Sequence, residues 1–220
     1  MTTRVVVVGA GGLGREVLDV VESRRQATGG IEVFGVVDDN PSEADLERLR
    51  VRGHSYLGTI EQVLSDVRAE GYVVGIGTPE VRRNVARKFD SAGWHAVSVV
   101  HPDASLGSEV AVEPGVVVCA GARVTTNTTI EAHALLNLNV TVGHDSRIGA
   151  FSVVNPGAHV SGDVAIQPVV LIGTGSVILQ GIQVAEGAII GANACVTKDI
   201  EAYVTVIGIP ARPLATRVGG

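Results

Sequence analysis

Hydrophobic residues recur at every sixth position through the second half of the chain. From Val100 to Val196, each of these positions holds Val, Ile or Leu, without an insertion or a slip. Four residues after each comes a smaller position, from Ala104 to Ile200, that is never charged or aromatic. A helix repeats at 3.6 residues and a strand at 2, so a period of six predicts short strands wound into a three-sided column. Coils stacked at the strand spacing of ~4.8 Å would give close to six coils over roughly 25 to 30 Å.

The first part of the chain follows a different pattern. Short β-branched stretches bounded by Gly or Asp predict strands over residues 4–9, 31–38, 72–77 and 95–100. Helices are predicted by an apolar stripe over Gly12–Arg25, by a capping box at Thr59 and Gln62 with a stop at Gly71, and by the cap Thr78-Pro79. This alternation predicts a small parallel sheet with crossover helices. We therefore expect an α/β, half-Rossmann-like domain over residues 1–97 and an all-β column with a C-terminal tail over residues 98–220.

Composition and charge narrow the classes of partner. The net charge of −6 is spread thinly, with no basic stripe, which argues against nucleic acid and anionic membrane as partners. No stretch reaches the roughly 18 apolar residues that span a bilayer, and the N-terminal residues lack the layout of a signal peptide. With only Cys119 and Cys195, the chain has no disulfide framework. These features predict a soluble cytoplasmic protein.

A glycine-rich loop follows the first predicted strand. Gly9, Gly11 and Gly14 have the G-x-G-x-x-G spacing at the start of a predicted helix, where backbone amides and the helix dipole stabilise a diphosphate. The next strand ends at Asp38 and Asp39, whose carboxylates can accept hydrogen bonds from a ribose or a base. Residues 1–97 provide only half of a dinucleotide-binding domain, so a single nucleotide, such as that of an activated sugar, fits better than NAD.

The segment HDSRIGAF, which begins at His144, is the main candidate for chemistry. Histidine titrates near neutrality, and a neighbouring carboxylate such as Asp145 can hold its ring in one tautomer and raise its basicity. His144 is the third residue of its six-residue unit, so we expect it at a corner of the column, where it is available to a ligand. Acyl transfer needs such a base, an oxyanion donor and both substrates held in place.

The chain as a whole resembles the NeuD/PglD-like family of sugar O- and N-acyltransferases, which are left-handed parallel β-helix proteins with hexapeptide repeats. The glycine loop, the column, HDSRIGAF and the closing VIGIPARPL (206–214) carry the resemblance. The left hand is implied by the resemblance, because the usual rule for parallel crossovers is right-handed. The implied activity is transfer of an acetyl group from acetyl-CoA to an amino group, in preference to a hydroxyl, of a nucleotide-linked sugar in glycan biosynthesis. The resemblance also implies a homotrimer with active sites between subunits, and no metal.

The resemblance assigns roles to individual residues. His144 would be the general base, Asp145 its acidic partner, Asn137 a polar group near the acceptor and Gly162 N–H the oxyanion donor. The nucleotide-linked sugar would contact Gly11, Gly12, Leu13, Asp38, Asp39 and Gly58. Acetyl-CoA would lie along the column against Val153, Gly173, Thr174, Gly191, Ala192, Pro210, Ala211 and Arg212. Many members have a second histidine where this chain has Val153, so a hydrogen bond to the acyl donor would be missing there.

Three other classes of protein remain open on these residues. A γ-type carbonic anhydrase also uses a hexapeptide column and would need zinc held by His133, His144 and His159, although their spacing lacks the H-x4-H pair associated with those enzymes. A non-catalytic nucleotide-sugar-binding protein would keep the fold and lose the chemistry, with Val153 as its support. NAD-dependent oxidoreduction rests on the glycine loop alone, and the short first domain argues against it.

Overall fold

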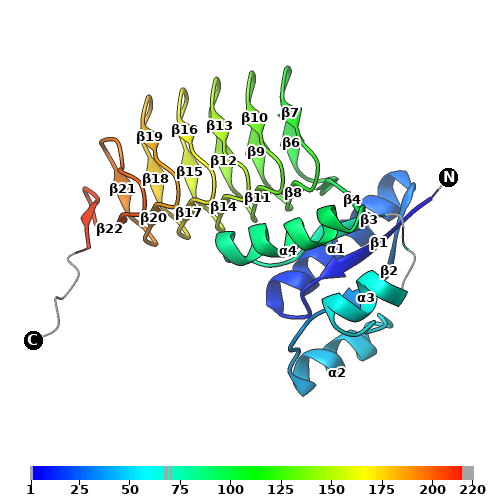
Figure 1. Ribbon diagram of the computed structural model, residues 1–220. Helices are drawn as coiled ribbons and strands as arrows, with labels where there is room; N and C mark the ends of the chain where they lie inside the picture. The colour runs from blue at the N-terminus through cyan, green and yellow to red at the C-terminus, as the bar shows by residue number, and fades with distance from the viewer. Residues whose placement is uncertain (1, 67–68, 70, 215–220) are drawn as a thin grey trace, which may run out of the picture.

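The computed structural model describes residues 2–66, 69 and 71–214. Its N-terminal part is a parallel sheet in the order β2-β1-β3-β4, with helices around it (Figure 1). The elements of this part are β1 (Thr3–Val8), α1 (Gly12–Thr28), β2 (Ile31–Val37), α2 (Glu43–Val51), α3 (Ile60–Asp66), β3 (Gly71–Val74), α4 (Pro79–Ser91) and β4 (His95–Ala96). The chain crosses from β1 to β2 on one side and continues to β3 on the other, so the carboxyl ends of β1 and β3 meet at a topological switch point.

Side-chain caps mark the starts of α2 and α3, and a proline in the first turn marks the start of α4. At α3 the capping box is present, because Thr59 N–H donates to Gln62 Oε1 and Gln62 N–H donates to Thr59 Oγ1. The helix α4 begins after Thr78 with Pro79 in its first turn, as the sequence predicts. The helix α2 was not predicted, although Ser42, whose hydroxyl accepts from Asp45 N–H, is an ordinary N-cap signal.

Two boundaries differ from the sequence prediction. Gly71 does not end a helix but begins β3, and glycine is needed there because a Cβ would lie 2.5 Å from Val97 Cγ2. The stretch predicted as one strand over residues 95–100 is two short strands in different sheets. The first of them, β4, closes the N-terminal sheet, and the second, Val99–Val100, begins the column.

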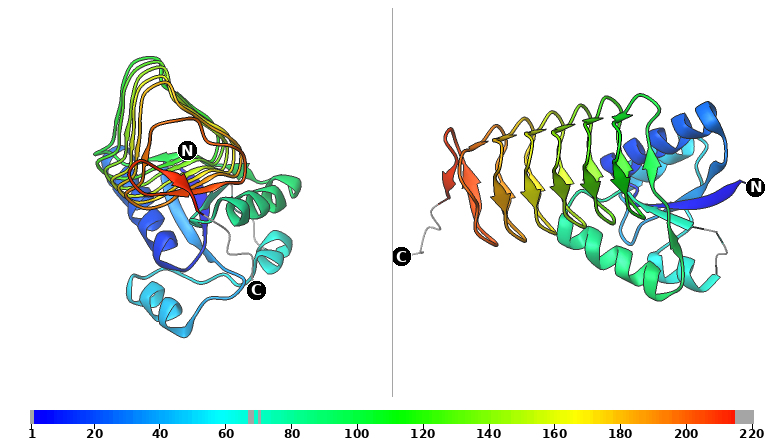
Figure 2. Two further views of the ribbon diagram at one scale, coloured as in Figure 1. Left: turned by 90° about the vertical axis from the view of Figure 1, so that its left-hand side faces the viewer. Right: turned by 90° about the horizontal axis from the view of Figure 1, so that it is seen from above.

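The rest of the chain is a parallel β-helix with three flat faces, visible end-on in Figure 2. One coil is 18 residues long, so that Thr141 pairs with Arg123 in the coil before it and with His159 in the coil after it. The strands of the first face are β5 (Val99–Val100), β8 (Val117–Val118), β11 (Leu135–Leu136), β14 (Val153–Val154), β17 (Leu171–Ile172), β20 (Ile189–Ile190), β22 (Thr205–Ile207) and β23 (Arg212–Pro213). The second face holds β6 (Ser105–Leu106), β9 (Arg123–Val124), β12 (Thr141–Val142), β15 (His159–Val160), β18 (Val177–Ile178) and β21 (Cys195–Val196). The third holds β7 (Ala111–Val112), β10 (Thr129–Ile130), β13 (Arg147–Ile148), β16 (Ala165–Ile166) and β19 (Gln183–Val184).

The interior of the β-helix confirms the period of six. The large positions, from Val118 to Val196, and the small positions between them form one continuous apolar core. Where a small position is polar, its hydroxyl is satisfied by the backbone: Ser152 Oγ donates to Gln167 O at 2.9 Å and accepts from Val170 N–H at 3.0 Å. Such residues therefore fit the core without an unpaired polar group.

The N-terminal part packs against the first face of the β-helix, which we call the docked face. Val117, Leu135 and Val153 point outward from this face and form a buried cluster with α1 residues such as Val17 and Leu18. Figure 1 shows α4 running along the column on the same side. The turns that join the second face to the third, which we call the apex turns, therefore lie on the opposite edge of the triangle, away from the N-terminal part (Figure 2).

A second contact between the two parts is polar and buried. Arg82 of α4 is fully buried, and its guanidinium donates to the carbonyl oxygens of His133, Val74 and Ile76. The His133 ring lies in the β-helix turn beneath it, stacked on Phe151 at 5.2 Å. Burial, and then the charge of Arg82, lower the pKa of His133 to about 4.

The lowered pKa of His133 predicts a loss of stability in weak acid. Because the folded state binds this proton only below about pH 4 whereas the unfolded state binds it below about 6.5, stability is fully present above pH 6.5 and falls between 6.5 and 4. The loss attributable to His133 is about 3 kcal/mol over that interval. Urea unfolding at several pH values checks this against the variant His133→Asn, which tolerates the positive φ of 58° and cannot titrate. Parallel stability curves for the two proteins would contradict the assignment.

Candidate active site and nucleotide pocket

The glycine loop between β1 and α1 combines close packing with open space. Gly9 has a φ of 115°, and a Cβ on Gly14 would overlap the Gly9 carbonyl oxygen, so these two glycines let the helix approach the strand. By contrast, a Cβ on Gly11 or Gly12 would meet nothing within 4 Å. Gly11 and Gly12 therefore stand at the open N-terminus of α1, where backbone N–H groups can meet an anion.

A pocket of about 200 Å³ lies at the carboxyl ends of β1 and β2, beside the glycine loop. It is lined by Val8, Gly9, Asp38, Asp39, Asn40, Ile60, Ile76, Val81 and Val85. Apolar side chains with a few polar groups at a switch point of a parallel sheet are typical of a small-molecule site. Of the predicted contacts, Leu13 is half-buried and packs beside Gly77, where a Cβ would lie 3.3 Å from Leu13 Cδ2.

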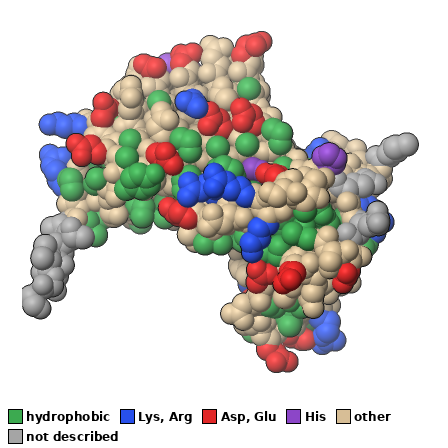
Figure 3. Space-filling view, viewed as in Figure 1, with side chains coloured by type: hydrophobic (Ala, Val, Ile, Leu, Met, Phe, Trp, Pro, Cys, Tyr) green, Lys and Arg blue, Asp and Glu red, His purple; other side chains and the backbone are tan. Residues whose placement is uncertain are grey.

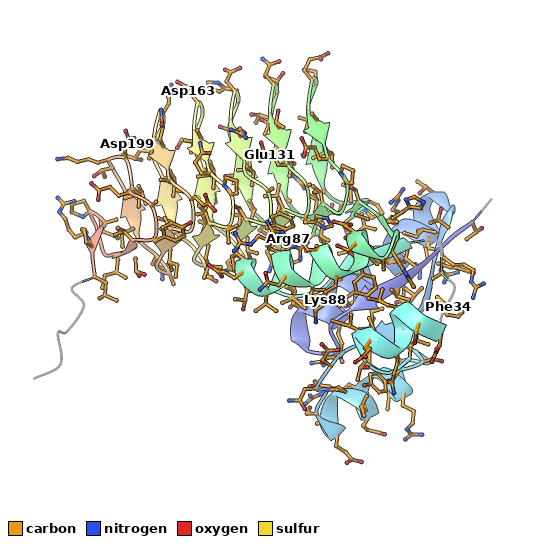
Figure 4. All side chains as sticks on the ribbon, in the orientation of Figure 1. Phe34, Arg87, Lys88, Glu131, Asp163 and Asp199 are labelled. Carbon is orange, nitrogen blue, oxygen red and sulfur yellow. The ribbon has the colours of Figure 1, made fainter. Side chains whose placement is uncertain are left out.

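The two aspartates of the pocket already have structural partners. Asp38 accepts from Ala10 N–H at 2.8 Å and from Asn40 N–H at 2.9 Å, so it holds the glycine loop in place. Asp39 Oδ1 accepts from Ile60 N–H at 2.8 Å, and its Oδ2 lies 4.0 Å from Lys88 Nζ, on α4 (Figure 4). Each carboxylate shapes the pocket first, and contact with a ligand would use its remaining lone pairs.

Gly58, which precedes α3, does not line this pocket but contacts Asp38, which does. Its φ is 104°, and its carbonyl oxygen accepts from Asp38 N–H at 3.2 Å. A Cβ there would lie within 2.5 Å of Gln62 Oε1, the atom that caps α3. Gly58 thus supports the position of Asp38.

His144 lies in the apex turn between β12 and β13, at a corner of the β-helix as predicted, with about half of its side chain exposed. Its Nδ1 lies 2.7 Å from Asp145 Oδ2, so the carboxylate accepts from Nδ1–H and leaves Nε2 with its lone pair. Asp145 has a φ of 58°, and the hydrogen bond from His144 is the main reason that the pKa of Asp145 lies below its usual value. A histidine in this state can accept a proton at Nε2.

Gly162 lies directly against the His144 ring in the next apex turn. A Cβ on Gly162 would lie 2.5 Å from His144 Nε2 and 2.7 Å from Cε1, so only glycine leaves room for the ring. Within the described part of the chain, no acceptor is paired with Gly162 N–H. The backbone of Gly162, with its unpaired N–H, therefore lies against the edge of the His144 ring that carries Nε2.

Asn127 also belongs to this group, and it was not predicted. It lies in the apex turn one coil before Asp145, and its Nδ2 donates to Asp145 Oδ1 at 3.2 Å. Counting back one full coil from a candidate residue would have found it, because residues one coil apart stack directly in a β-helix.

Asn137 is not near His144 within one chain. It lies at the corner between the docked face and the second face, is 5% exposed, and its Oδ1 accepts from Leu138 N–H at 2.7 Å. Gly173 and Gly191 stack along the same corner, one and two coils beyond Asn155, with exposed Thr174 and Ala192 beside them. The predicted acetyl-CoA residues of the coils therefore form one ridge, on a different edge from His144.

Val153 requires a correction. The resemblance implies that it lies against acetyl-CoA, but its side chain is fully buried in the cluster between the docked face and α1. Its strand neighbours, Leu135 and Leu171, belong to the same cluster. Val153 is thus a packing residue, and a valine there says nothing about which acyl donor is used.

The far end of the β-helix carries a second pocket, of about 360 Å³. Ala211 and Arg212 line it together with Lys198, whereas Pro210 does not. Its other lining residues are Asp199, Ile200, Glu201, Val204, Val206 and Pro213. Lys198 and Arg212 give this end two cations, and phosphate groups of a ligand are a suitable partner for them.

The three histidines of the zinc alternative lie in different places. His133 is buried beneath α4, His144 is in an apex turn, and His159 is on the second face with its Nδ1 2.9 Å from Thr141 Oγ1. Among the described residues, no group of three or more His, Cys, Asp or Glu side chains is placed to hold a metal ion. No helix in the same residues is long and apolar enough to cross a membrane.

Comparisons with known proteins agree with this geometry. Residues 4–89 match the family model described as the PglD N-terminal domain. A GDP-perosamine N-acetyltransferase of Escherichia coli O157:H7 is 29% identical over 214 residues, which cover 94% of this chain and 95% of that protein. The acetyltransferase domain of PglB from Neisseria gonorrhoeae superposes with a TM-score of 0.83 at 29% identity, covering 97% of this chain and 100% of that one. A mutant of perosamine N-acetyltransferase from Caulobacter crescentus, solved with CoA and GDP-perosamine, superposes with a TM-score of 0.85 at 29% identity, covering 96% and 97%. The fold is thus an α/β domain followed by a left-handed β-helix, as predicted.

Proposed function

We propose that this chain, which matches the PglD N-terminal domain over residues 4–89 and is similar to sugar N-acetyltransferases over its length, transfers an acetyl group from acetyl-CoA to an amino group of a nucleotide-linked sugar. The observation that carries the proposal is the environment of His144. Its Nδ1 is held by Asp145 at 2.7 Å, and its Nε2 lies against Gly162, whose N–H has no partner among the residues that the structure describes. A base and an oxyanion donor at one point are what the attack of an amine on a thioester needs.

In the proposed reaction, each of these groups has one task. The amine nitrogen attacks the thioester carbonyl carbon, so that a C–N bond forms and the C–S bond breaks. The amine proton passes to His144 Nε2 and from there to the departing thiolate of coenzyme A. Asp145 stabilises the imidazolium that forms in between, and Gly162 N–H donates to the carbonyl oxygen as it gains negative charge.

We further propose that the active site is assembled between subunits of a homotrimer. The nucleotide pocket belongs to the part of the chain that packs on the docked face, whereas His144 is in an apex turn between β12 and β13. Figure 2 shows the apex turns on the edge of the β-helix away from the N-terminal part. A sugar bound in the pocket therefore cannot be delivered to His144 of its own chain. Asn137 and the ridge of Gly173 and Gly191 lie on a third edge, which a neighbouring copy can bring to His144.

The glycine loop offers a matched pair of variants for the nucleotide site. Gly11→Val adds a side chain in open space at ordinary backbone angles, so we expect at least about tenfold weaker binding of a nucleoside diphosphate sugar and an unchanged Tm. Gly14→Ala forces a methyl group onto the Gly9 carbonyl, so we expect a loss of about 1–3 kcal/mol of stability. Calorimetric titration and thermal unfolding measure both. If Gly11→Val binds the ligand as tightly as the original protein, the nucleotide does not lie on this loop.

The activity itself is tested by thiol release from acetyl-CoA. The purified protein is incubated with a panel of nucleotide-linked sugars that differ in base and in the presence of an amino group. We expect thiol release with at least one amino sugar and none with free nucleotide. Binding of a nucleotide-linked amino sugar without thiol release across the panel would instead identify a binding protein that lacks the chemistry.

A further inference from the structure

Asn127 stands out among the groups near His144 because nothing in the acetyl-transfer chemistry described above uses it. It lies in the apex turn between β9 and β10, and Asp145 lies one coil further, in the apex turn between β12 and β13. Both residues have left-handed backbone conformations, with φ of 55° and 58°. Both turns therefore present their side chains in the same way, one above the other, at the spacing of neighbouring strands.

The Asp145 carboxylate is held at both of its oxygens. Oδ2 accepts from His144 Nδ1 at 2.7 Å, and Oδ1 accepts from Asn127 Nδ2 at 3.2 Å. Asp145 N–H donates to Thr126 O at 3.1 Å, which ties its backbone to the turn of Asn127. With one partner on each oxygen, rotation of the carboxylate about its Cβ–Cγ bond breaks both hydrogen bonds.

We propose that Asn127 is a positioning residue, which fixes the Asp145 carboxylate and thereby keeps the His144 proton on Nδ1 and the lone pair on Nε2. This inference rests on the proposed function, because only a reaction that uses Nε2 as a base requires that tautomer. An amide suits the position for two reasons. It donates to a carboxylate without adding charge, and asparagine is among the few side chains that readily adopt a positive φ.

The charges around His144 explain why a neutral amide suits position 127. On the turns stacked around His144, the ionisable groups are Asp145 in its own turn, Asp163 in the next turn and Glu109 two turns before. Asp163 is labelled in Figure 4, and Figure 3 shows acidic side chains along this edge. Arg147, on the strand after His144, is paired with Glu131 instead. A carboxylate at position 127 would therefore add a negative charge to an edge that already carries several, and would repel Asp145.

The proposal is tested with Asn127→Gly, which removes the amide without straining the backbone, and with the matched control Glu109→Gly. Glu109 has the same backbone conformation, with a φ of 56°, at the equivalent position of the apex turn one coil before Asn127, and its side chain is exposed. Losing one hydrogen bond of this kind predicts a kcat about three- to tenfold lower for Asn127→Gly, with the KM of both substrates unchanged. We expect the control to retain its kcat. Equal effects of the two variants on kcat would show a general effect of glycine and would overturn the proposal.

Two further measurements separate positioning from a structural effect. In the background of Asp145→Asn, Asn127→Gly is expected to cause no additional loss of kcat, because the carboxylate through which it acts is gone. Nitrogen NMR of the His144 ring in the free protein is expected to show a single tautomer, with Nδ1 protonated, and a mixture in Asn127→Gly. An additive loss in the double variant, or an unchanged tautomer, would contradict the proposal.

The variant Asn127→Asp is expected to change the pH dependence of the reaction. It keeps the shape of the side chain but adds a negative charge, which favours the protonated ring, so the acidic limb of the pH–rate profile is expected to move to higher pH. An unmoved limb would contradict the placement of Asn127 in this group. If the original protein transfers no acetyl group, both the proposed function and the role of Asn127 are wrong. If the original protein is active and the Asn127 variants are equally active, only the role of Asn127 is wrong.

Discussion

Replacing His144 with alanine is expected to lower the turnover of acetyl transfer by at least ~10²-fold, because the amine loses the base that takes its proton. Nucleotide binding should be unchanged, since all residues that line the pocket beside the glycine loop belong to the N-terminal part and none to the β-helix. Thiol release measures the first quantity and calorimetric titration the second. Activity close to that of the original protein would exclude His144 as the base.

The control for this variant is His159→Ala. His159 lies one coil beyond Thr141 on the second face, and its Nδ1 is 2.9 Å from the Thr141 hydroxyl. We expect this variant to keep its turnover. A zinc enzyme that used His133, His144 and His159 would instead lose comparable activity in both variants, and would also contain stoichiometric zinc on metal analysis.

Replacing Gly162 with alanine is the second change with a large expected effect. The added Cβ would lie 2.5 Å from His144 Nε2, so the ring must leave the position in which Asp145 holds it. Because Gly162 has no positive φ, alanine causes no backbone strain there, and the loss should fall on the chemistry. We expect a kcat at least about 10²-fold lower with a Tm within a few degrees of the original value.

The combination of the two variants shows whether the loss acts through the ring. In a His144→Ala background there is no ring for the new methyl group to meet, so Gly162→Ala is expected to add little further loss. Two losses that simply multiply would mean that Gly162 acts on its own, through its N–H or through the local backbone. Such a result would leave His144 as the base but would remove the steric explanation given above.

The β-helix could be predicted from the sequence because its interior repeats. Every sixth residue from Val100 to Val196 faces the same core, so a local rule applies along the whole column. The α/β part was predictable in type but less so in detail. The boundaries of its elements depend on tertiary contacts that leave no periodic pattern in the sequence. Gly71 is an example, because glycine is required there by the proximity of Val97 and not by the end of a helix.

The candidate site was predictable only in part. His144, Asp145 and Gly162 lie together as expected, because they are one coil apart or adjacent. Val153 was misplaced because the sequence does not say which outward face the α/β part covers. Asn137 lies at another corner for a related reason, since a period of six does not tell which corners of different subunits meet.

The aspartates after β2 show that the sequence does not separate a structural from a ligand-binding role of a carboxylate. Asp38 and Asp39 are at the pocket as predicted, yet each also accepts a hydrogen bond from a backbone N–H, of Ala10 and of Ile60. A carboxylate at a strand end therefore serves the loop as well as a ligand, and the sequence alone cannot separate the two uses. Replacing either residue would disturb the pocket and the binding together.

Product analysis is the direct test of whether this protein forms an amide on a nucleotide-linked sugar. The protein is incubated with acetyl-CoA and with a pair of nucleotide-linked sugars that carry an amine or a hydroxyl at the same carbon. We expect one free thiol for each molecule of amino sugar consumed, and a product whose acetyl group is on nitrogen by mass spectrometry and NMR. Acetylation of the hydroxyl compound alone, or tight binding of both sugars with no thiol released, would exclude amide formation as the reaction of this protein.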